Sequence, residues 1–301
     1  MVTTASGTRA RRVRRWRWLV VLAGGAGLWI ASVLVTAGTG NPALLPTVVL
    51  LGGFLVPVSA VVWNFDHEAD SALSGQRVAY AFIGGGTLGV LAASVLESWL
   101  LQDALLPYLA VGLIEEAVKL IALVVASLGL SRYTTRDGIV LGATVGFGFA
   151  ALESSGYAFV ALLTPGGGPL VGVVGTQILR NVLAPIGHGL WTAILGGFLF
   201  HAAASSGRLR PSWGLAGAYL LVSLLHAGWD AMRGIAILLT MLLTATPRQL
   251  ALLERGVLPP VLTWQVGLFL GLEFAGMLVV AVIGVGVLIA IRRRWVEPTT
   301  T

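Results

Sequence analysis

Long apolar runs separated by short polar segments fill most of the chain, and eight of them are long enough to cross a bilayer. A transmembrane helix needs about 20 predominantly apolar residues. The pattern therefore predicts an all-α protein, a polytopic transmembrane helical bundle of about eight spans. The predicted spans lie near residues 18–37, 44–63, 78–98, 104–130, 137–163, 173–204, 213–231 and 261–291.

Two basic ends flank the apolar part, which predicts three parts of the chain. Residues 1–17 form a basic cytoplasmic segment, residues 18–291 a single transmembrane domain with its main motifs in 104–230, and residues 292–301 a basic cytoplasmic tail. A basic start before an apolar run is also typical of a cleaved signal peptide. The length of the first run and the spans that follow favour an uncleaved helix.

Arginines gather at one end of the predicted spans. The loops 64–77, 131–136 and 205–210 and both termini carry most of them, although Arg180, Arg233, Arg248 and Arg255 do not follow this bias. Because Lys and Arg accumulate on the cytoplasmic side, we expect both termini in the cytoplasm.

One segment, residues 234–260, is ambiguous. Its apolar part, residues 235–244, is too short for a span and favours a re-entrant or surface-lying helix on the outer side. A second feature is a row of small residues at Gly138, Gly142, Gly146 and Ala150, which predicts a face where another helix approaches closely.

Composition agrees with a membrane protein. Charged residues make up 11% and hydrophobic residues 56% of 301, with a mean hydropathy of +0.89, whereas soluble domains are about 25% charged. The net charge of +6 comes from arginines at span ends and does not indicate nucleic acid as a partner; the lipid bilayer is the expected surrounding. There is no cysteine, so any metal site must use His, Asp and Glu.

The predicted fourth span carries Glu115, Glu116 and Lys119 in its middle. Each ionisable group at that depth costs on the order of 2.5–3.5 kcal/mol on insertion scales, so partners or a task are expected. Lys119 lies three and four residues after the two glutamates, where it can pair with either. Because adjacent helical residues are about 100° apart, we expect one glutamate to hold the lysine and the other to face a cavity. The plain alternative is an ion cluster that only joins helices.

The next three spans add Glu153, His188 and His226. At ~1.5 Å per residue from the predicted cytoplasmic helix ends, Glu115, Glu153, His188 and His226 lie ~24, ~24, ~26 and ~20 Å deep. This shared level, in the outer half of a hydrocarbon core about 30 Å thick, predicts one cluster. Taken singly, each buried histidine would be read as a hydrogen-bonded packing residue.

Two glutamates and two histidines in one cavity suit hydrolysis. A glutamate can take a proton from water, and histidines can bind a metal or stabilise an oxyanion. The cofactor is therefore either none or one divalent metal ion such as Zn²⁺, with Glu153, His188 and His226 as its expected ligands. The H-E-x-x-H motif of soluble zinc proteases is absent. Asp230, four residues after His226, could orient its imidazole.

These motifs, taken in order, are recognisable. Glu115-Glu116-x-x-Lys119, then Phe149-x-x-x-Glu153, then one histidine in each of the next two spans, resembles the PrsW family of intramembrane proteases. That family belongs with the CAAX-processing type II proteases and the γ-secretase scaffold subunit. The resemblance covers about residues 104–230, and Ser154 departs from the asparagine expected there.

The resemblance implies an active site within the membrane and hydrolysis of peptide bonds in a membrane-anchored protein substrate. It implies a bacterial-type plasma membrane and, as for PrsW, a first cut in an anti-sigma factor near the outer face. Glu115 would activate the water, Glu116 and Lys119 would tune it, and Glu153, His188 and His226 would complete the catalytic set.

Two other functions fit the same residues. A non-catalytic scaffold would bind transmembrane partners in the same cavity, and an ion or proton carrier would use the carboxylates and histidines as a relay. A carrier usually shows repeats and broken helices around a midplane site, and no repeat is found. Outside the cluster, Arg180 and Asn181 are expected at headgroup level, and Glu97 and Asp103 in an outer loop.

Overall fold

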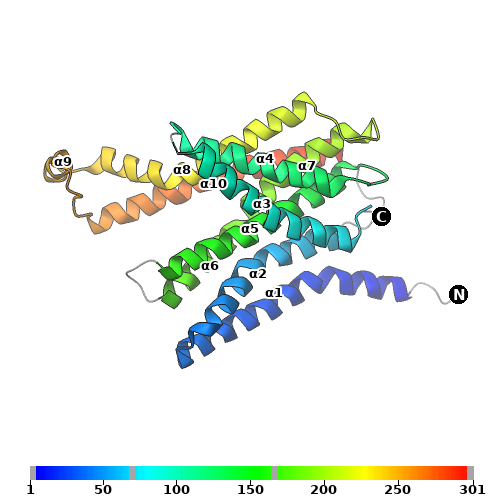
Figure 1. Ribbon diagram of the computed structural model, residues 1–301, viewed down its shortest axis with the longest axis horizontal. Coiled ribbons are helices and arrows are strands. Elements are labelled where there is room, and N and C mark those ends of the chain that lie inside the picture. The colour runs from blue at the N-terminus through cyan, green and yellow to red at the C-terminus, as the bar shows by residue number, and fades with distance from the viewer. Residues whose placement is uncertain (1–4, 68–71, 103, 164–168, 297–301) are drawn as a thin grey trace.

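The computed structural model describes residues 5–67, 72–102, 104–163 and 169–296. Within these ranges, side chains are described from residue 16 onward, except that of residue 169. Every regular element in these ranges is a helix, which confirms the all-α prediction (Figure 1). The α-helices are α1 (Ala5–Thr39), α2 (Leu45–Asp66), α3 (Gly75–Leu100), α4 (Pro107–Ser127), α5 (Thr135–Leu163), α6 (Pro169–Leu183), α7 (His188–Ala204), α8 (Trp213–Thr244), α9 (Pro247–Glu254) and α10 (Thr263–Trp295). Two 3-10 helices, η1 (Pro42–Leu44) and η2 (Ala184–Ile186), precede α2 and α7.

Seven segments of the described chain are long and apolar enough to cross a membrane: Trp16–Thr39, Pro42–Asp66, Gly75–Leu100, Thr135–Leu163, Leu170–Ala204, Trp213–Thr244 and Thr263–Trp295. The remaining predicted span, the fourth, corresponds to α4, which has 21 residues but carries the three charged residues of its motif. Large apolar side chains cover the outer surfaces of the bundle, as expected for helices that face lipid.

Two of the predicted helices have other bounds. The sixth predicted span is broken, because η2 and Gly187 separate α6 from α7, and His188 becomes the first residue of α7. The apolar part of 234–260 is not a separate re-entrant or surface-lying helix, since α8 runs without interruption to Thr244. The short α9 follows and joins α8 to α10 at the far end of this hairpin (Figure 1).

The centre of the bundle is α5, whose row of small residues packs on α7 as predicted. A Cβ atom added at Gly138 would overlap the carbonyl oxygen of Gly196, and one at Gly146 would overlap that of His188. Backbones this close need glycine, since any other side chain would separate the helices. The row therefore fixes the position of His188 against α5.

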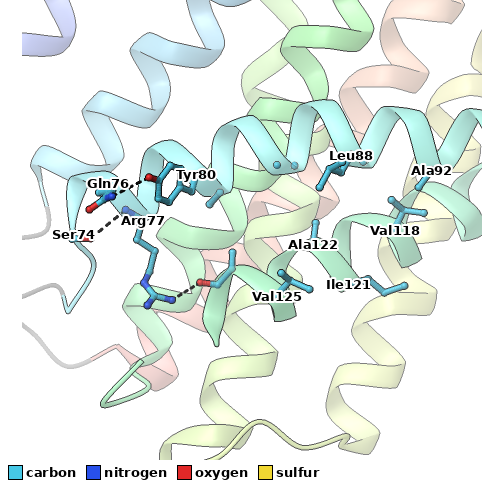
Figure 2. Close-up of a pocket in the computed structure, with 15 residues that line it drawn as sticks. Ser74, Gln76, Arg77, Tyr80, Leu88, Ala92, Val118, Ile121, Ala122 and Val125 are labelled. Carbon is cyan, nitrogen blue, oxygen red and sulfur yellow. Dashed lines mark hydrogen bonds between the residues drawn. The ribbon is translucent and has the colours of Figure 1, made fainter. Parts of the chain in front are cut away.

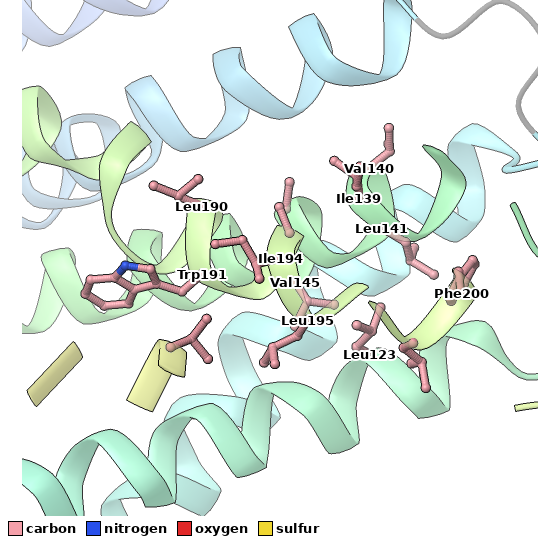
Figure 3. Packing of buried hydrophobic residues seen from close by; sticks show 14 of the residues in the cluster. Leu123, Ile139, Val140, Leu141, Val145, Leu190, Trp191, Ile194, Leu195 and Phe200 are labelled. Carbon is pink, nitrogen blue, oxygen red and sulfur yellow. The ribbon is translucent and has the colours of Figure 1, made fainter. Parts of the chain in front are cut away.

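The apolar core lies beside this contact. Leu123 of α4 and Ile194 and Leu195 of α7 have no exposed surface, and they pack with Val145 of α5 (Figure 3). Trp191 lies at one end of the same group in Figure 3 and is 1% exposed. The helices α4, α5 and α7 are thus held together by close packing up to the level of the polar residues.

Candidate functional site

The charged motif of α4 forms a closed ion cluster within one helical turn. The Nζ atom of Lys119 lies 2.6 Å from Oε1 of Glu116 and 3.2 Å from Oε2 of Glu115, and the lysine side chain is fully buried. The expectation that only one glutamate would hold the lysine is wrong, because residues three and four positions before it flank the same ammonium. The expectation that Lys119 finds a partner among these glutamates is confirmed.

Phe149, the first residue of the second motif, supports this ammonium. The Nζ atom of Lys119 lies 4.4 Å from the centre of the Phe149 ring, a cation–π contact. The ring is 1% exposed and also lies 5.3 Å from the imidazole of His188, between ring centres. The phenylalanine one turn before Glu153 therefore packs against both the lysine and a histidine of the charged cluster.

His226 is brought to the cluster by the close approach of α8 to α4. A Cβ at Gly112 would overlap the carbonyl oxygen of Ser223, so glycine is needed one turn before the glutamates. The Nδ1 atom of His226 then lies 3.0 Å from Oε1 of Glu116. Trp191 of α7 stacks on its imidazole, with ring centres 4.7 Å apart, and fixes the plane of the ring.

His188 is placed by the break between α6 and α7. Its Nε2 atom lies 2.9 Å from Oε2 of Glu153, and its Nδ1 atom lies 2.8 Å from Nζ of Lys119. The four side chains predicted to converge, Glu115, Glu153, His188 and His226, thus form one cluster with Glu116 and Lys119. These residues lie on α4, α5, α7 and α8, which are far apart along the chain, and the bundle brings them together.

Both histidines have the same arrangement around Glu115. The Oε2 atom of Glu115 lies 3.7 Å from Nε2 of His226 and 3.9 Å from Nδ1 of His188. The other ring nitrogen of each histidine contacts a carboxylate, Glu116 for His226 and Glu153 for His188. Each ring therefore turns one nitrogen toward Glu115 while a carboxylate holds the opposite nitrogen.

This arrangement fits a metal site. Glu115, His188 and His226 offer donor atoms within 4.8 Å of one another, and two histidines with one glutamate are a known catalytic zinc set. A metal-ligating histidine usually has its second nitrogen held by a carboxylate or carbonyl, as both do here. The third member of the group is Glu115 and not Glu153, whose Oε2 contacts His188 and Arg180. The ammonium of Lys119 contacts the same Nδ1 of His188 and would compete with a metal for it.

Sequence reasoning missed the role of Arg180, which it placed at headgroup level. Its guanidinium donates to Oε2 of Glu153 at 2.6 Å and to Oγ of Ser154 at 2.8 Å. Ser154, noted as a departure from the family pattern, thus accepts a bond from the same arginine. The sequence feature that could have indicated this role is the position of Arg180 about two helical turns before His188. Its neighbour Asn181 bonds instead to the backbone of Gly52 on α2.

Asp230 contacts His226 on an unexpected side. Its Oδ2 atom lies 3.3 Å from Nε2, the nitrogen that faces Glu115, while Glu116 occupies the opposite nitrogen. Asp230 therefore borders the space in front of Glu115 and does not lie behind the histidine. Trp191, which contacts both histidines, was also missed; its only signal is the one-turn spacing from His188.

Exposure rises across the cluster from one side to the other. The side chains of Lys119 and Glu116 are 0% exposed, those of Glu153 and Arg180 are 19% and 25%, and that of Asp230 is 33%. Asp230 and Arg180 therefore form the accessible rim. Glu97, expected in a loop, lies in the last turn of α3, and Asp103 lies outside the described residues.

A helical bundle that buries ionisable side chains at the level of its spans defines a membrane protein with a polar site inside the bilayer, where such groups are costly and functional. Comparison of the chain with models of known protein families shows which class of membrane protein it is. Residues 14–254 match the PrsW family of intramembrane metalloproteases, and the chain belongs to this family. It is therefore a membrane protease. No curated protein and no solved structure gave a significant match.

Proposed function

We propose that the triangle of Glu115, His188 and His226 is the reaction centre for hydrolysis of a peptide bond within or beside the membrane. The observation that carries the proposal is the matched orientation of the two histidines, each with one nitrogen toward Glu115 and the other held by a carboxylate. A packing histidine needs no such paired arrangement, whereas a histidine that acts at a fixed point in space does.

Glu115 is the base in this proposal. Its Oε2 atom makes each of the contacts to Lys119, His188 and His226, which leaves Oε1 to accept a proton from the attacking water. The water oxygen then bonds to the scissile carbonyl carbon, and the proton passes to the amine that leaves as the carbon–nitrogen bond breaks. The histidines stabilise the oxygen anion that forms in between.

A divalent metal such as zinc would be held by His188, His226 and Glu115. When bound, it supplies a Lewis acid that polarises the carbonyl and acidifies water. Glu116 and Glu153 would then fix the two imidazole rings through their opposite nitrogens, and Asp230 contacts the nitrogen of His226 that faces Glu115.

The position of the accessible rim supports a proposal for the substrate class. Asp230 lies after His226 on α8, and Arg180 lies before His188 on α6, so both lie toward the end of the bundle that carries α9. With both termini in the cytoplasm of a bacterial-type cell, this is the outer side. We therefore propose membrane-anchored proteins cut near the outer face, in the manner of the first cleavage of an anti-sigma factor.

The test uses Glu115→Gln in purified protein reconstituted with a transmembrane peptide substrate. The glutamine keeps the shape but cannot accept the proton, so we expect cleavage to fall by about 10²–10⁴-fold while substrate still binds. Elemental analysis of both proteins shows whether the carboxylate also holds a metal. Normal cleavage by the variant would contradict the role of Glu115; no cleavage by the wild type, with binding intact, would favour a scaffold.

A further inference from the structure

A cavity separate from the polar cluster lies between α3 and α4. It has a volume of about 690 Å³ and is lined by residues 74–92 of α3 and 118–126 of α4. Figure 2 shows α3 and α4 side by side along it, with Ser74, Gln76, Arg77 and Tyr80 at one end and Leu88, Ala92 and Val118 at the other. The volume falls within the ~300–1,000 Å³ typical of sites for small ligands.

The polar end carries a guanidinium with free donors. Nη1 of Arg77 bridges the two helices by donating to the carbonyl oxygens of Ala126 and Leu128, at 2.6 and 2.8 Å. Within the described part of the chain its Nε and Nη2 atoms have no partner, and no carboxylate pairs with it. Lys119 and Arg180 differ, since each is paired with glutamate. Arg77 therefore offers positive charge and three N–H groups at the mouth of the cavity.

The rest of the cavity is apolar and faces outward. Leu88, Ile121 and Val125 line it and are 69%, 63% and 61% exposed, so in a bilayer they meet acyl chains. A Cβ atom at Gly84 would touch nothing within 4 Å, which leaves room beside α3 there. The cavity is thus an open channel along the bilayer, with a cationic group at one end only.

We propose that the α3–α4 cavity binds an anionic phospholipid, with the headgroup phosphate at Arg77 and one acyl chain along Gly84, Ile121 and Ala122. Guanidinium groups bind phosphate through paired N–H donors, and Gln76 and Tyr80 add polar groups at headgroup level. In the predicted orientation Arg77 is at the cytoplasmic surface, where anionic lipids gather.

A transmembrane helix of a substrate fits this cavity less well. The cytoplasmic flanks of such helices are rich in Lys and Arg, which the positive charge of Arg77 would repel. A helix with side chains is also about 10–12 Å across, so a cavity of about 690 Å³ would hold fewer than two turns of it. Charge and shape both favour the lipid.

Occupancy of the cavity would bear on α4. Val118 lines the cavity and directly precedes Lys119, whose ammonium joins Glu115 and Glu116. A lipid chain that fills the space between α3 and α4 therefore packs against the helix that carries the polar cluster. The proposal itself concerns binding and does not depend on proteolysis.

The test is native mass spectrometry of the full-length protein in detergent, with phosphatidylglycerol or phosphatidylcholine of identical chains. We expect phosphatidylglycerol to bind about fivefold better, the effect of one arginine near an anionic headgroup. Arg77→Gln should abolish this preference and Arg77→Lys should retain most of it. Arg210→Gln is the matched control, because Arg210 also caps a helix end, at the carbonyl of Ala202, but lines no part of this cavity.

A second variant leaves Arg77 untouched. Gly84→Leu places a side chain in the open space and should reduce binding of both lipids. An unchanged preference in Arg77→Gln, an equal loss in Arg210→Gln, or undiminished binding in Gly84→Leu would each overturn the proposal. Ile121→Cys offers a further check, because the chain has no cysteine of its own. A crosslink from this cysteine to a transmembrane substrate, in place of lipid, would also overturn the proposal.

Discussion

Two buried polar clusters lie at different places in this bundle, and they differ in charge. The first is the group around Glu115, where three acidic side chains, one lysine and two histidines contact one another across α4, α5, α7 and α8. The second lies where α8, α9 and α10 meet. There Gln249 and Gln265 bond to each other at 2.9 Å and to the backbone at Thr244, Pro260 and Leu262.

The neutral cluster holds the connection between α8 and α10 in place, whereas the charged cluster has no such structural role. The two amides satisfy backbone groups that the ends of α8 and α10 leave open, which is what a buried turn requires. In the first cluster nearly all partners are other ionisable side chains, and Oε2 of Glu116 is buried without a hydrogen bond in the described structure. A cluster that leaves such groups in a bilayer without serving the backbone is better explained by chemistry than by architecture.

The largest effect on proteolysis, beside that of Glu115→Gln, is expected for Lys119→Met. The change leaves two adjacent buried carboxylates without their cation, so one must hold a proton and the charge pattern of the site is lost. We expect cleavage to fall by about 10²–10⁴-fold, with an altered pH–rate profile and a folded protein in the membrane.

Lys119→Arg is the control for this change. It keeps the charge and the donors, although with a different geometry, and should retain more activity. If Lys119→Met cleaves substrate with an unchanged pH profile, the lysine only joins the helices, and the charged cluster would be architectural like the neutral one.

Gly146→Ala tests whether packing places the chemistry. The added Cβ would overlap the carbonyl oxygen of His188, so the first residue of α7 must move away from α5 and change its position relative to Glu115. A displacement near 1 Å can cost about 100-fold in rate, and we expect roughly 10–100-fold here. Gly156→Ala on the same helix meets open space and should cleave normally; equal losses in both variants would contradict this account.

A smaller effect is expected for Arg180→Met. Arg180 holds Glu153, which in turn holds His188, so it acts on the reaction centre through two other side chains. Removal of such an outer partner costs on the order of tenfold. Arg180→Lys should recover part of the rate, measured as kcat and KM separately. A change confined to KM would assign the arginine to substrate binding at the rim.

The sequence predicted the charged cluster better than the neutral one, for a physical reason. Ionisable residues inside apolar runs stand out because the bilayer penalises them, so Glu115, Glu153, His188 and His226 could be found and matched by depth. The row from Gly138 to Ala150 likewise has a period that indicates a packing face. Gln249 and Gln265 lie near helix ends, where glutamine is unremarkable, and their pairing depends on tertiary structure.

Other features needed the structure for similar reasons. The break before His188 depends on Ala184-Pro185-Ile186-Gly187, a short segment inside a run that is long enough to be predicted as one span. Arg180 looked like an interfacial residue because its partner Glu153 is 27 positions away in the chain. Which ring nitrogen faces Glu115 cannot be read from spacing, because it depends on the rotation of each imidazole.

The smallest effect on proteolysis is expected for Gln265→Leu. Gln265 is fully buried, and its amide donates to Thr244 on α8 and accepts from the backbone of Leu262. Leucine therefore removes the partner of these backbone groups and one of the bonds of Gln249. Each unsatisfied buried group costs about 1–3 kcal/mol, and we expect a lower thermal unfolding temperature in detergent. The variant should still cleave within about twofold of wild type once folded, because the neutral cluster lies at the far end of the α8–α10 hairpin. Gln102→Leu, which replaces an exposed glutamine, should change neither property. A large loss of activity in Gln265→Leu at a temperature where the protein stays folded would mean that the two clusters are coupled through α8, and the contrast between chemistry and architecture would not hold.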